Sequence, residues 1–248
     1  MKDLSWLTKR PVAHRGLHDA GGGIIENTPS AIKAAIEGGY AIEVDLQLAG
    51  DGEAMVFHDS TLDRLTTESG PLVGRSAAAL REIAFKATKD RMMTLPELLE
   101  MVSGQVPLVI EIKSQWGNVG PLERRAAQVL RPYKGAAAVM SFDPLSVAAF
   151  VTLAPDIPRG IVAERFRDLD EWSQTTAWQR FVMRHLLHIS RTKFDFVAYD
   201  VHGLPSAAPL IARFLLRKPL LTWTVRTKTD RLRARVFANQ MIFEGFRA

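Results

Sequence analysis

Short apolar segments alternate with helical patterns along this chain of 248 residues, and this alternation limits the fold more than any other feature. Near-continuous apolar segments such as 107–113 and 220–225 suit strands that are covered on both faces of a parallel sheet. We predict eight strands, at residues 11–14, 41–48, 54–58, 107–113, 137–142, 160–163, 195–199 and 220–225. Eight strands separated by helices in about 250 residues predict a (β/α)8 TIM barrel with parallel strands.

The predicted helices lie between these strands. Thr28 and Pro29 are typical of a helix start, and Gly38 is typical of a helix end. The segment 94–97 has the pattern of a capping box, with Thr followed three residues later by Glu. Further helices are predicted at residues 124–130, 144–153, 206–216 and 230–238, whereas 63–93 and 166–190 have no clear pattern. A doubly wound open sheet is the alternative fold.

Several classes of protein are excluded by what the sequence lacks. The first predicted strand is followed by His-Arg-Gly-Leu-His rather than by G-x-G-x-x-G, so a dinucleotide site is unsupported. The chain contains no Cys, which excludes disulfides, thiolate zinc sites and a Cys nucleophile, and it contains no G-x-S-x-G elbow. No segment approaches 18 apolar residues, and residues 1–10 lack the apolar core of a secretory signal. We therefore expect a cytoplasmic protein.

The net charge of +5 conceals a strong asymmetry along the chain. Residues 11–63 contain nine acids and two bases, whereas residues 179–248 contain four acids and thirteen bases. An acidic N-terminal third is a poor surface for nucleic acid, because a phosphate backbone requires clustered Lys and Arg. We expect no nucleic-acid partner, and the concentrated carboxylates indicate a cation instead.

Ionisable residues stand at the ends of the first four predicted strands. They are His14 and Arg15, Glu43 and Asp45, His58, and Glu111 and Lys113. In a parallel barrel these ends meet at one face, where such residues are typically catalytic. Residues two apart share a face of a strand, so the three carboxylates are expected to converge. They would repel one another unless a cation joined them, and oxygen ligands suit Mg²⁺, Ca²⁺ or Mn²⁺. Ion pairs with Arg15 and Lys113 are the alternative explanation.

The histidines and the basic residues predict the chemistry. His14 and His58, at the ends of the first and third predicted strands, can divide the work of acid and base. Arg15 and Lys113 beside a divalent ion are typical of a phosphate-binding site. The set predicts metal-assisted attack at phosphorus, in which charge stabilisation dominates. His188, in contrast, is predicted at the surface or the edge of the core.

An ordered series of short motifs resembles the glycerophosphodiester phosphodiesterase family. In chain order these are Ala-His-Arg-Gly at 13–16, Glu-Asn-Thr at 26–28, Ile-Glu-Val-Asp-Leu at 42–46, Asp-Gly at 51–52, Val-Phe-His-Asp at 56–59, Leu-Asp-Arg-Leu-Thr at 62–66, Thr-Leu-Pro-Glu at 94–97, Glu-Ile-Lys at 111–113 and Trp-Thr-Val at 223–225. Any one of these motifs is weak, but the set spans almost the whole chain in order.

The resemblance implies a TIM barrel that hydrolyses glycerophosphodiesters to glycerol 3-phosphate and an alcohol with a divalent cation. It implies the metal ligands Glu43, Asp45 and Glu111, the acid–base pair His14 and His58, and the phosphate contacts Arg15 and Lys113. It also makes Trp223, at the end of the last predicted strand, an apolar wall of the substrate pocket. These residues, Trp223 apart, are the ones that the strand-end pattern selects.

The sequence departs from the family pattern at its end. The family usually has an Asp-Gly and a Thr-Asp pair after the last apolar segment, whereas this chain has residues 240–246 there. This departure is expected to change which alcohol the protein accepts as part of its substrate, rather than the reaction that it catalyses. The segment between His58 and Thr94 is short, so we expect little or no inserted domain and one domain over residues 1–248.

Two competing functions are left open. One is hydrolysis of lysophospholipids at a membrane surface, as by a lysophospholipase D, and the other is a catalytically silent barrel that serves as a binding scaffold. The apolar residues of 181–187, with Arg180 and Arg184 beside them, suit a membrane surface, as do Lys228, Arg231 and Arg235 at helical spacing. A soluble diester is the favoured substrate. The identity of the alcohol, the preferred ion, the oligomeric state and the attacking group (water or a substrate hydroxyl) stay open.

Overall fold

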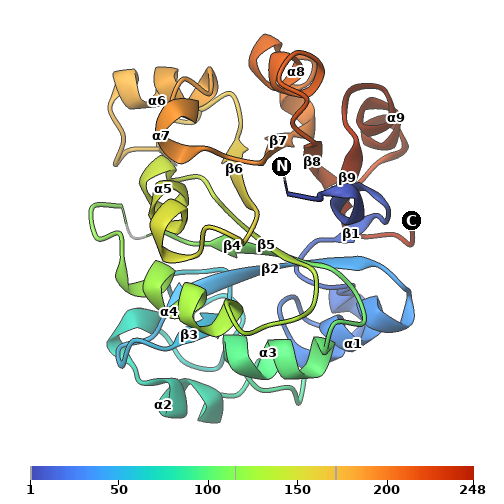
Figure 1. The fold of residues 1–248 in the computed structure, drawn as a ribbon. Coiled ribbons are helices and arrows are strands. Elements are labelled where there is room, and N and C mark those ends of the chain that lie inside the picture. The colour runs from blue at the N-terminus through green and yellow to red at the C-terminus, as the bar shows by residue number, and fades with distance from the viewer. Residues whose placement is uncertain (1, 115, 171) are drawn as a thin grey trace.

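A computed structural model describes residues 2–114, 116–170 and 172–248. Eight parallel strands close into a barrel, because the order β1-β9-β8-β7-β6-β5-β4-β2 is completed by a pairing of β1 with β2. The strands of the barrel are β1 (Val12–Ala13), β2 (Ala41–Leu48), β4 (Leu108–Ile112), β5 (Ala137–Ser141), β6 (Arg159–Ala163), β7 (Phe196–Asp200), β8 (Leu220–Val225) and β9 (Gln240–Phe243). The predicted TIM barrel is confirmed (Figure 1).

Helices surround the barrel. They are α1 (Pro29–Glu37), α2 (Ala77–Glu82), α3 (Leu95–Val102), α4 (Pro121–Leu130), α5 (Pro144–Leu153), α6 (Ala177–Arg184), α7 (Ile189–Thr192), α8 (Ala207–Phe214) and α9 (Lys228–Phe237). Short 3₁₀ helices are η1 (Ser5–Thr8), η2 (Ala20–Gly22), η3 (Leu72–Gly74) and η4 (Val201–Gly203). The predicted capping box at Thr94 and Glu97 is present. Within the described ranges, no helix is both long and apolar enough to cross a membrane.

The predicted third strand is not part of the barrel, which is a correction to the sequence analysis. β3 (Ala54–Val56) pairs antiparallel with the carboxyl half of β2, with Leu46 opposite Val56. The connection 49–53 is a tight turn, and a parallel crossover needs a dozen or more residues. The eighth barrel strand is β9, in the closing segment that had not been counted as a strand. Trp223 consequently lies in the penultimate strand.

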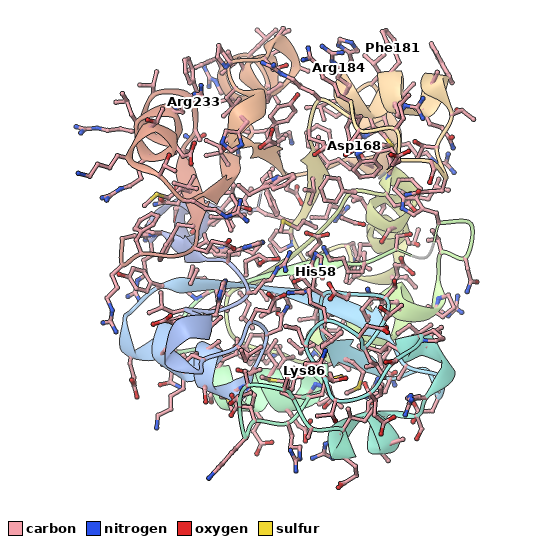
Figure 2. All side chains as sticks on the ribbon, turned by 180° about the vertical axis from the view of Figure 1, so that it is seen from behind. His58, Lys86, Asp168, Phe181, Arg184 and Arg233 are labelled. Atoms are coloured by element: carbon pink, nitrogen blue, oxygen red, sulfur yellow. The ribbon has the colours of Figure 1, made fainter. Side chains whose placement is uncertain are left out.

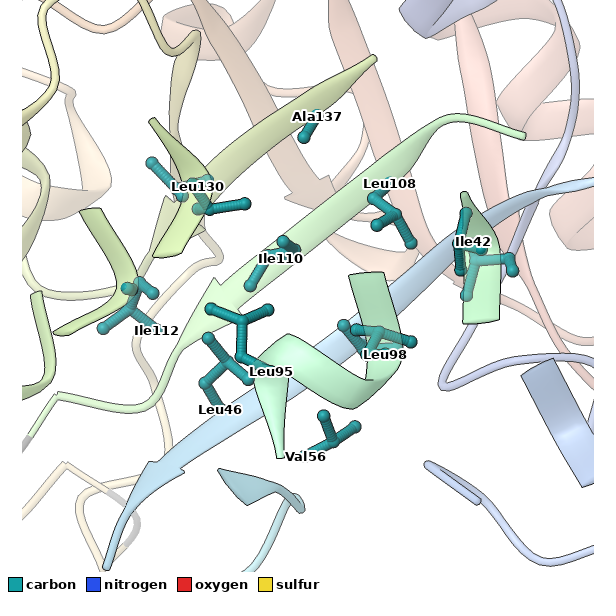
Figure 3. Close-up of a cluster of buried hydrophobic side chains, with 14 of the residues drawn as sticks. Ile42, Leu46, Val56, Leu95, Leu98, Leu108, Ile110, Ile112, Leu130 and Ala137 are labelled. Atoms are coloured by element: carbon teal, nitrogen blue, oxygen red, sulfur yellow. The ribbon is translucent and has the colours of Figure 1, made fainter. Parts of the chain in front are cut away.

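Side-chain alternation divides the core into an outer and an inner layer. Figure 3 shows the outer layer, where Leu95 and Leu98 of α3 pack against β2 and β4. Ile110 belongs to this layer, whereas Val109 belongs to the cluster inside the barrel. Since alternate residues face opposite sides, Glu111 points into the barrel with Val109. The same rule directs the carboxylates of β2 inward.

His188 is buried, although it was predicted at the surface or core edge. Only 7% of the residue is exposed, and its ring lies 6.1 Å from the ring of Phe194. Nδ1 lies 3.4 Å from the hydroxyl of Thr192, whereas Nε2 has no hydrogen-bond partner among the described residues. Burial lowers the pKa of His188 to about 4. The imidazole is therefore neutral in the fold at neutral pH.

We expect His188 to make the fold sensitive to mild acid. The unfolded chain takes up a proton near pH 6.5, whereas the folded chain does so only near pH 4. Stability is therefore full above pH 6.5, falls between pH 6.5 and 4, and then levels off, with a loss of about 3 kcal/mol at most. Denaturant unfolding of wild type and His188→Gln across this window measures the difference in slope. His185→Gln, at an exposed position, is the control, and equal slopes for wild type and His188→Gln would contradict the expectation.

Candidate active site

Three carboxylates converge inside the mouth of the barrel. Glu43 and Asp45 lie two residues apart on β2, and Asp45 is directly opposite Glu111 on β4. Each of the two β2 side chains is 1% exposed, and one oxygen from each of the three carboxylates lies within 4.8 Å of the others. The expected convergence of the strand-end carboxylates is therefore present in the fold.

Basic and amide groups partly compensate this negative charge. The Lys113 ammonium lies 2.6 Å from Glu111 Oε1 and 2.9 Å from Asp45 Oδ1. Arg15 Nε lies 3.3 Å from Asp45 Oδ2, and the Arg15 backbone N–H donates to Glu43 Oε2 over 2.9 Å. Asn27 donates to Asp45 Oδ2 from its side-chain amide. The ion pairs that were considered as an alternative to a metal are thus present, but they leave part of the cluster unsatisfied.

The unsatisfied part is visible in one oxygen and in one pKa. Among the described residues, Glu43 Oε1 is buried and accepts no hydrogen bond, whereas Asp45 Oδ1 has the Lys113 ammonium at 2.9 Å. Burial raises the pKa of Glu43 well above its usual range, and Asp45 and Glu111 raise it further. Burial also opposes ionisation of Asp45, but Lys113 and other nearby positive groups lower its pKa overall. Buried carboxylate oxygens without donors fit a hard divalent cation.

Each candidate acid–base histidine is anchored by a carboxylate. His14 Nδ1 lies 2.5 Å from Glu244 Oε2, and His58 Nδ1 lies 2.7 Å from Asp59 Oδ1. The other nitrogen of His14 lies 3.9 Å from Glu43 Oε2, so the ring spans from its anchor to the carboxylate cluster. Burial lowers the pKa of His14, and the hydrogen bond to Glu244 opposes that effect. Such carboxylate partners orient an imidazole and stabilise its charged form.

The two histidines reach the site by different routes. His14 follows the parallel barrel strand β1, whose next residue Arg15 is in the left-handed region at φ 54°. His58 follows β3, which runs back along β2 toward the barrel, and Gln47 of β2 donates to the carbonyl of His58 over 2.8 Å. Figure 2 shows His58 near the middle of the molecule. The prediction placed His58 at the site for the wrong structural reason.

A chain of ion pairs links the two sides of the site. Glu26 Oε1 lies 2.6 Å from Arg15 Nη1 and 2.7 Å from Arg64 Nη2. Arg64 Nε donates to Asp59 Oδ2 over 2.6 Å, and Asp59 anchors His58. No role is predicted from the sequence for Glu26, Asn27, Arg64 or Glu244. Glu26, Asn27 and Arg64 occur in the quoted motifs and could have been found there, whereas no local pattern marks Glu244.

A cavity of about 560 Å³ opens beside the carboxylates. Its polar lining includes His58, Glu111 and Lys113, and its aromatic lining consists of Trp116, Phe142 and Trp172. Trp223, the predicted pocket wall, is half-buried and is not among the residues that line this cavity, but its ring centroid lies 5.5 Å from that of Phe142. The site therefore combines a charged half with an apolar half, which suits a phosphodiester with an organic substituent.

Comparisons with the sequences of known proteins identify the family of this chain. The model of the glycerophosphoryl diester phosphodiesterase family matches residues 14–246. The chain therefore belongs to this family and is by family a phosphoric diester hydrolase. The Bacillus subtilis protein YhdW is 29% identical over 223 residues, which cover 81% of this chain and 89% of YhdW. A glycerophosphodiester phosphodiesterase of Caldanaerobacter subterraneus is 30% identical over 161 residues, 61% of this chain and 65% of that protein.

Solved structures show the same fold. An Oleispira antarctica phosphodiesterase, solved in complex with the product sn-glycerol-3-phosphate, superposes with a TM-score of 0.75 at 21% identity, over 94% of this chain and 91% of that chain. A glycerophosphodiester phosphodiesterase of Thermotoga maritima gives a TM-score of 0.71 at 20% identity, over 94% of both chains. The barrel and its closure are thus shared with structures of this family.

We expect Glu244→Gln to impair catalysis through His14. The neutral amide cannot stabilise the charged imidazole, so turnover of a glycerophosphodiester should fall roughly 10- to 100-fold. The limb of the pH–rate profile that reports His14 should also move to lower pH, because Glu244 raises the pKa of His14. Arg226 Nε donates to Glu244 over 2.6 Å, so Arg226→Gln is the matched control for loss of that ion pair alone. An unchanged profile in Glu244→Gln would show that Glu244 does not position His14.

Proposed function

We propose that this protein hydrolyses glycerophosphodiesters to glycerol 3-phosphate and an alcohol at this site. One observation carries the proposal: three buried carboxylates, of which Glu43 has an oxygen without a donor among the described residues, lie beside a histidine that a carboxylate anchors. The related Oleispira antarctica enzyme, which was solved with sn-glycerol-3-phosphate, supports the substrate class. The family assignment favours an enzyme over a silent scaffold.

Glu43, Asp45 and Glu111 are the residues that would hold a divalent cation, with Mg²⁺, Ca²⁺ and Mn²⁺ as the candidates. Their oxygens are hard ligands and come from two neighbouring strands. When bound, such an ion polarises a phosphoryl oxygen and offsets negative charge. Arg15 and Lys113, which contact the carboxylates in this structure, also carry the positive charge that a substrate phosphate requires.

His14 and His58 move the protons of the reaction. One imidazole takes the proton of the attacking hydroxyl while the new O–P bond forms. The ester P–O bond breaks, and the other imidazole gives a proton to the oxygen of the departing alcohol. The attacking group is either water or a hydroxyl of the substrate, in which case water then opens a cyclic phosphate. Glu244 and Asp59 stabilise each imidazole while it is charged.

The aromatic side of the cavity is the proposed site for the organic part of the substrate. Phe142 and Trp172 line it directly, with ring centroids 5.2 Å apart. Trp223 contacts Phe142 edge to face, and we propose that it acts on the substrate pocket through this contact. Contacts with the aromatic wall would strengthen binding of the organic part of the substrate, whereas the charged half of the site would bind the phosphate.

A panel of phosphodiesters tests the proposed function. Glycerophosphodiesters with several head groups, a lysophospholipid and a non-glycerol phosphodiester are each incubated with the enzyme, and glycerol 3-phosphate and free alcohol are measured. We expect equal amounts of glycerol 3-phosphate and alcohol from the glycerophosphodiesters. Release of alcohol from the lysophospholipid alone would replace the proposal with hydrolysis at a lipid surface.

Removal of the metal should abolish activity. In a chelator, turnover should be lost, and addition of Mg²⁺, Ca²⁺ or Mn²⁺ should restore it. The ion should also raise the thermal midpoint of the wild type, because it binds only the folded state. Glu43→Gln should lower turnover by roughly 10²-fold or more and remove the shift of the midpoint. Glu37→Gln on the exposed surface is the control. Full activity in chelator would remove the ion from the proposal.

The histidines should act on turnover rather than on ion binding. His14→Ala and His58→Ala should each lower turnover by about 10²- to 10⁴-fold, the usual range for a positioned acid or base. Each variant should keep the ion-induced shift of the thermal midpoint, if the three carboxylates are the ligands. His185→Ala is the control, since His185 is exposed on the outer side of the barrel. A variant that loses the ion-induced shift would identify its histidine as a ligand.

A further inference from the structure

Exposed apolar side chains are concentrated on one part of the surface. Among the described residues, thirteen large hydrophobic side chains are exposed, and six of them lie on α8, on α9 or in the turn after α8. The six are Ile211, Phe214, Leu215, Leu216, Leu232 and Val236. We call this surface the α8–α9 face. Its residues have no part in the site described above.

The apolar residues of α9 occupy the outward side of the helix. Leu232 and Val236 lie one turn apart and are 63% and 54% exposed, whereas Asp230 and Ala234 on the opposite side are buried. A helix on the surface of a soluble barrel normally points charged residues outward and apolar residues toward the core. The outermost row of α9 is instead apolar, and solvation alone does not account for it.

The apolar residues of α8 continue the same surface. Ile211 and Phe214 are 50% and 67% exposed, and Ala212 on the inner side of the helix is buried. A guanidinium nitrogen of Arg213 donates to the carbonyl of Val236 over 3.2 Å, which ties α8 to α9. The two helices lie side by side on the outside of the barrel (Figure 1). Their exposed apolar residues therefore lie on neighbouring parts of the surface.

Basic residues flank these rows. Residues 207–237 contain eight bases and one acid, Asp230, which is buried and accepts hydrogen bonds at the start of α9. Arg226 pairs with Glu244. The remaining seven bases pair with no acidic side chain in the part of the chain that the structure describes. They are Arg213, Arg217, Lys218, Lys228, Arg231, Arg233 and Arg235.

A cavity at the edge of the face adds a place for a phosphate group. It has a volume of about 510 Å³ and lies between α9 and β9. Arg231 and Arg235 line it, together with the apolar side chains of Leu232 and Met241. Two guanidinium groups next to apolar side chains suit a lipid head group whose acyl chains begin beside it.

We propose that the α8–α9 face binds the surface of an anionic lipid bilayer. An apolar row flanked by Lys and Arg is the pattern of helices that lie in the membrane interface. Each base held near an anionic surface strengthens binding by roughly fivefold. Nucleic acid would use the bases but leave the apolar row in water, and a purely electrostatic contact with an acidic protein would do the same. A bilayer satisfies both.

The face lies on the side of the barrel, whereas the active site lies at the carboxyl ends of the strands. Docking would therefore leave the mouth of the barrel accessible to soluble diesters. The proposal is independent of the hydrolytic reaction, and the two can fail separately. Hydrolysis of a soluble glycerophosphodiester is measured on every variant to keep them apart.

Sedimentation with vesicles tests the proposal. Wild type is mixed with phosphatidylcholine vesicles, with or without roughly a third of phosphatidylglycerol, at low and moderate salt. We expect pelleting with the anionic vesicles only, weakened by salt. The variant R231Q/R235Q should bind roughly 25-fold more weakly, and F214S/L232S at least about tenfold more weakly. Both variants should keep the thermal midpoint and the soluble activity of the wild type.

Two controls remove the same kinds of group elsewhere. K33Q/K89Q removes two exposed charges from the other side of the barrel, and W178S/F181S removes the stacked aromatic pair of α6. Unchanged vesicle binding by both supports the α8–α9 face, and loss of binding in W178S/F181S alone would move the surface to α6 and overturn the proposal. The proposal would be overturned if the protein pelleted equally with neutral vesicles, or if it pelleted with no vesicles at any salt concentration. It would also be overturned if the protein bound no vesicles but bound duplex DNA or associated with itself, and if the R231Q/R235Q or F214S/L232S substitutions weakened that binding.

Discussion

The repulsion among Glu43, Asp45 and Glu111 is the constraint on which the rest of the site depends. Three carboxylates inside a barrel are unfavourable unless positive groups surround them. Lys113 and Arg15 supply two such groups, and Asn27 supplies an amide donor. One oxygen of Glu43 nevertheless lies buried without a donor among the described residues, and burial raises the pKa of this carboxyl. A divalent cation is the simplest group that would complete the compensation, and in the proposed reaction its charge would also attract and activate a phosphate.

The positioning of the two histidines follows from the same constraint. Imidazoles that exchange protons near buried carboxylates need partners of their own, and Glu244 and Asp59 provide them. Arg64 and Glu26 connect the Asp59 side to Arg15 on the other side. Acidic and basic side chains therefore alternate along this chain of ion pairs. Each charge has a partner of opposite sign, and these contacts hold the side chains in place.

The asymmetry of charge along the chain becomes an asymmetry in space. The acidic N-terminal part supplies the site, through β2 and the segments beside it, whereas the basic C-terminal part supplies the outer helices α8 and α9. The proposed reaction and the proposed membrane contact therefore use different parts of the barrel. The predicted basic spacing of Lys228, Arg231 and Arg235 is present on α9, and the structure adds the apolar row that lies beside it.

The sequence by itself determined the features that depend on local spacing. Alternation of residues along β2 and β4 sets which carboxylates point inward, and the helix start at Thr94 depends on side chains three residues apart. These patterns were sufficient for the fold class, for seven of the eight barrel strands, for the three carboxylates and for the family resemblance.

The tertiary structure decided what depends on contacts between distant residues. Glu244 meets His14 across 230 positions only because β9 closes the barrel against β1. His58 enters through an antiparallel hairpin, because a short connection forces β3 back along β2. Exposure of the apolar row on α9 likewise depends on what packs against the helix. The periodic pattern in the sequence shows only that one face of the helix is more apolar than the other, not which face is exposed to solvent.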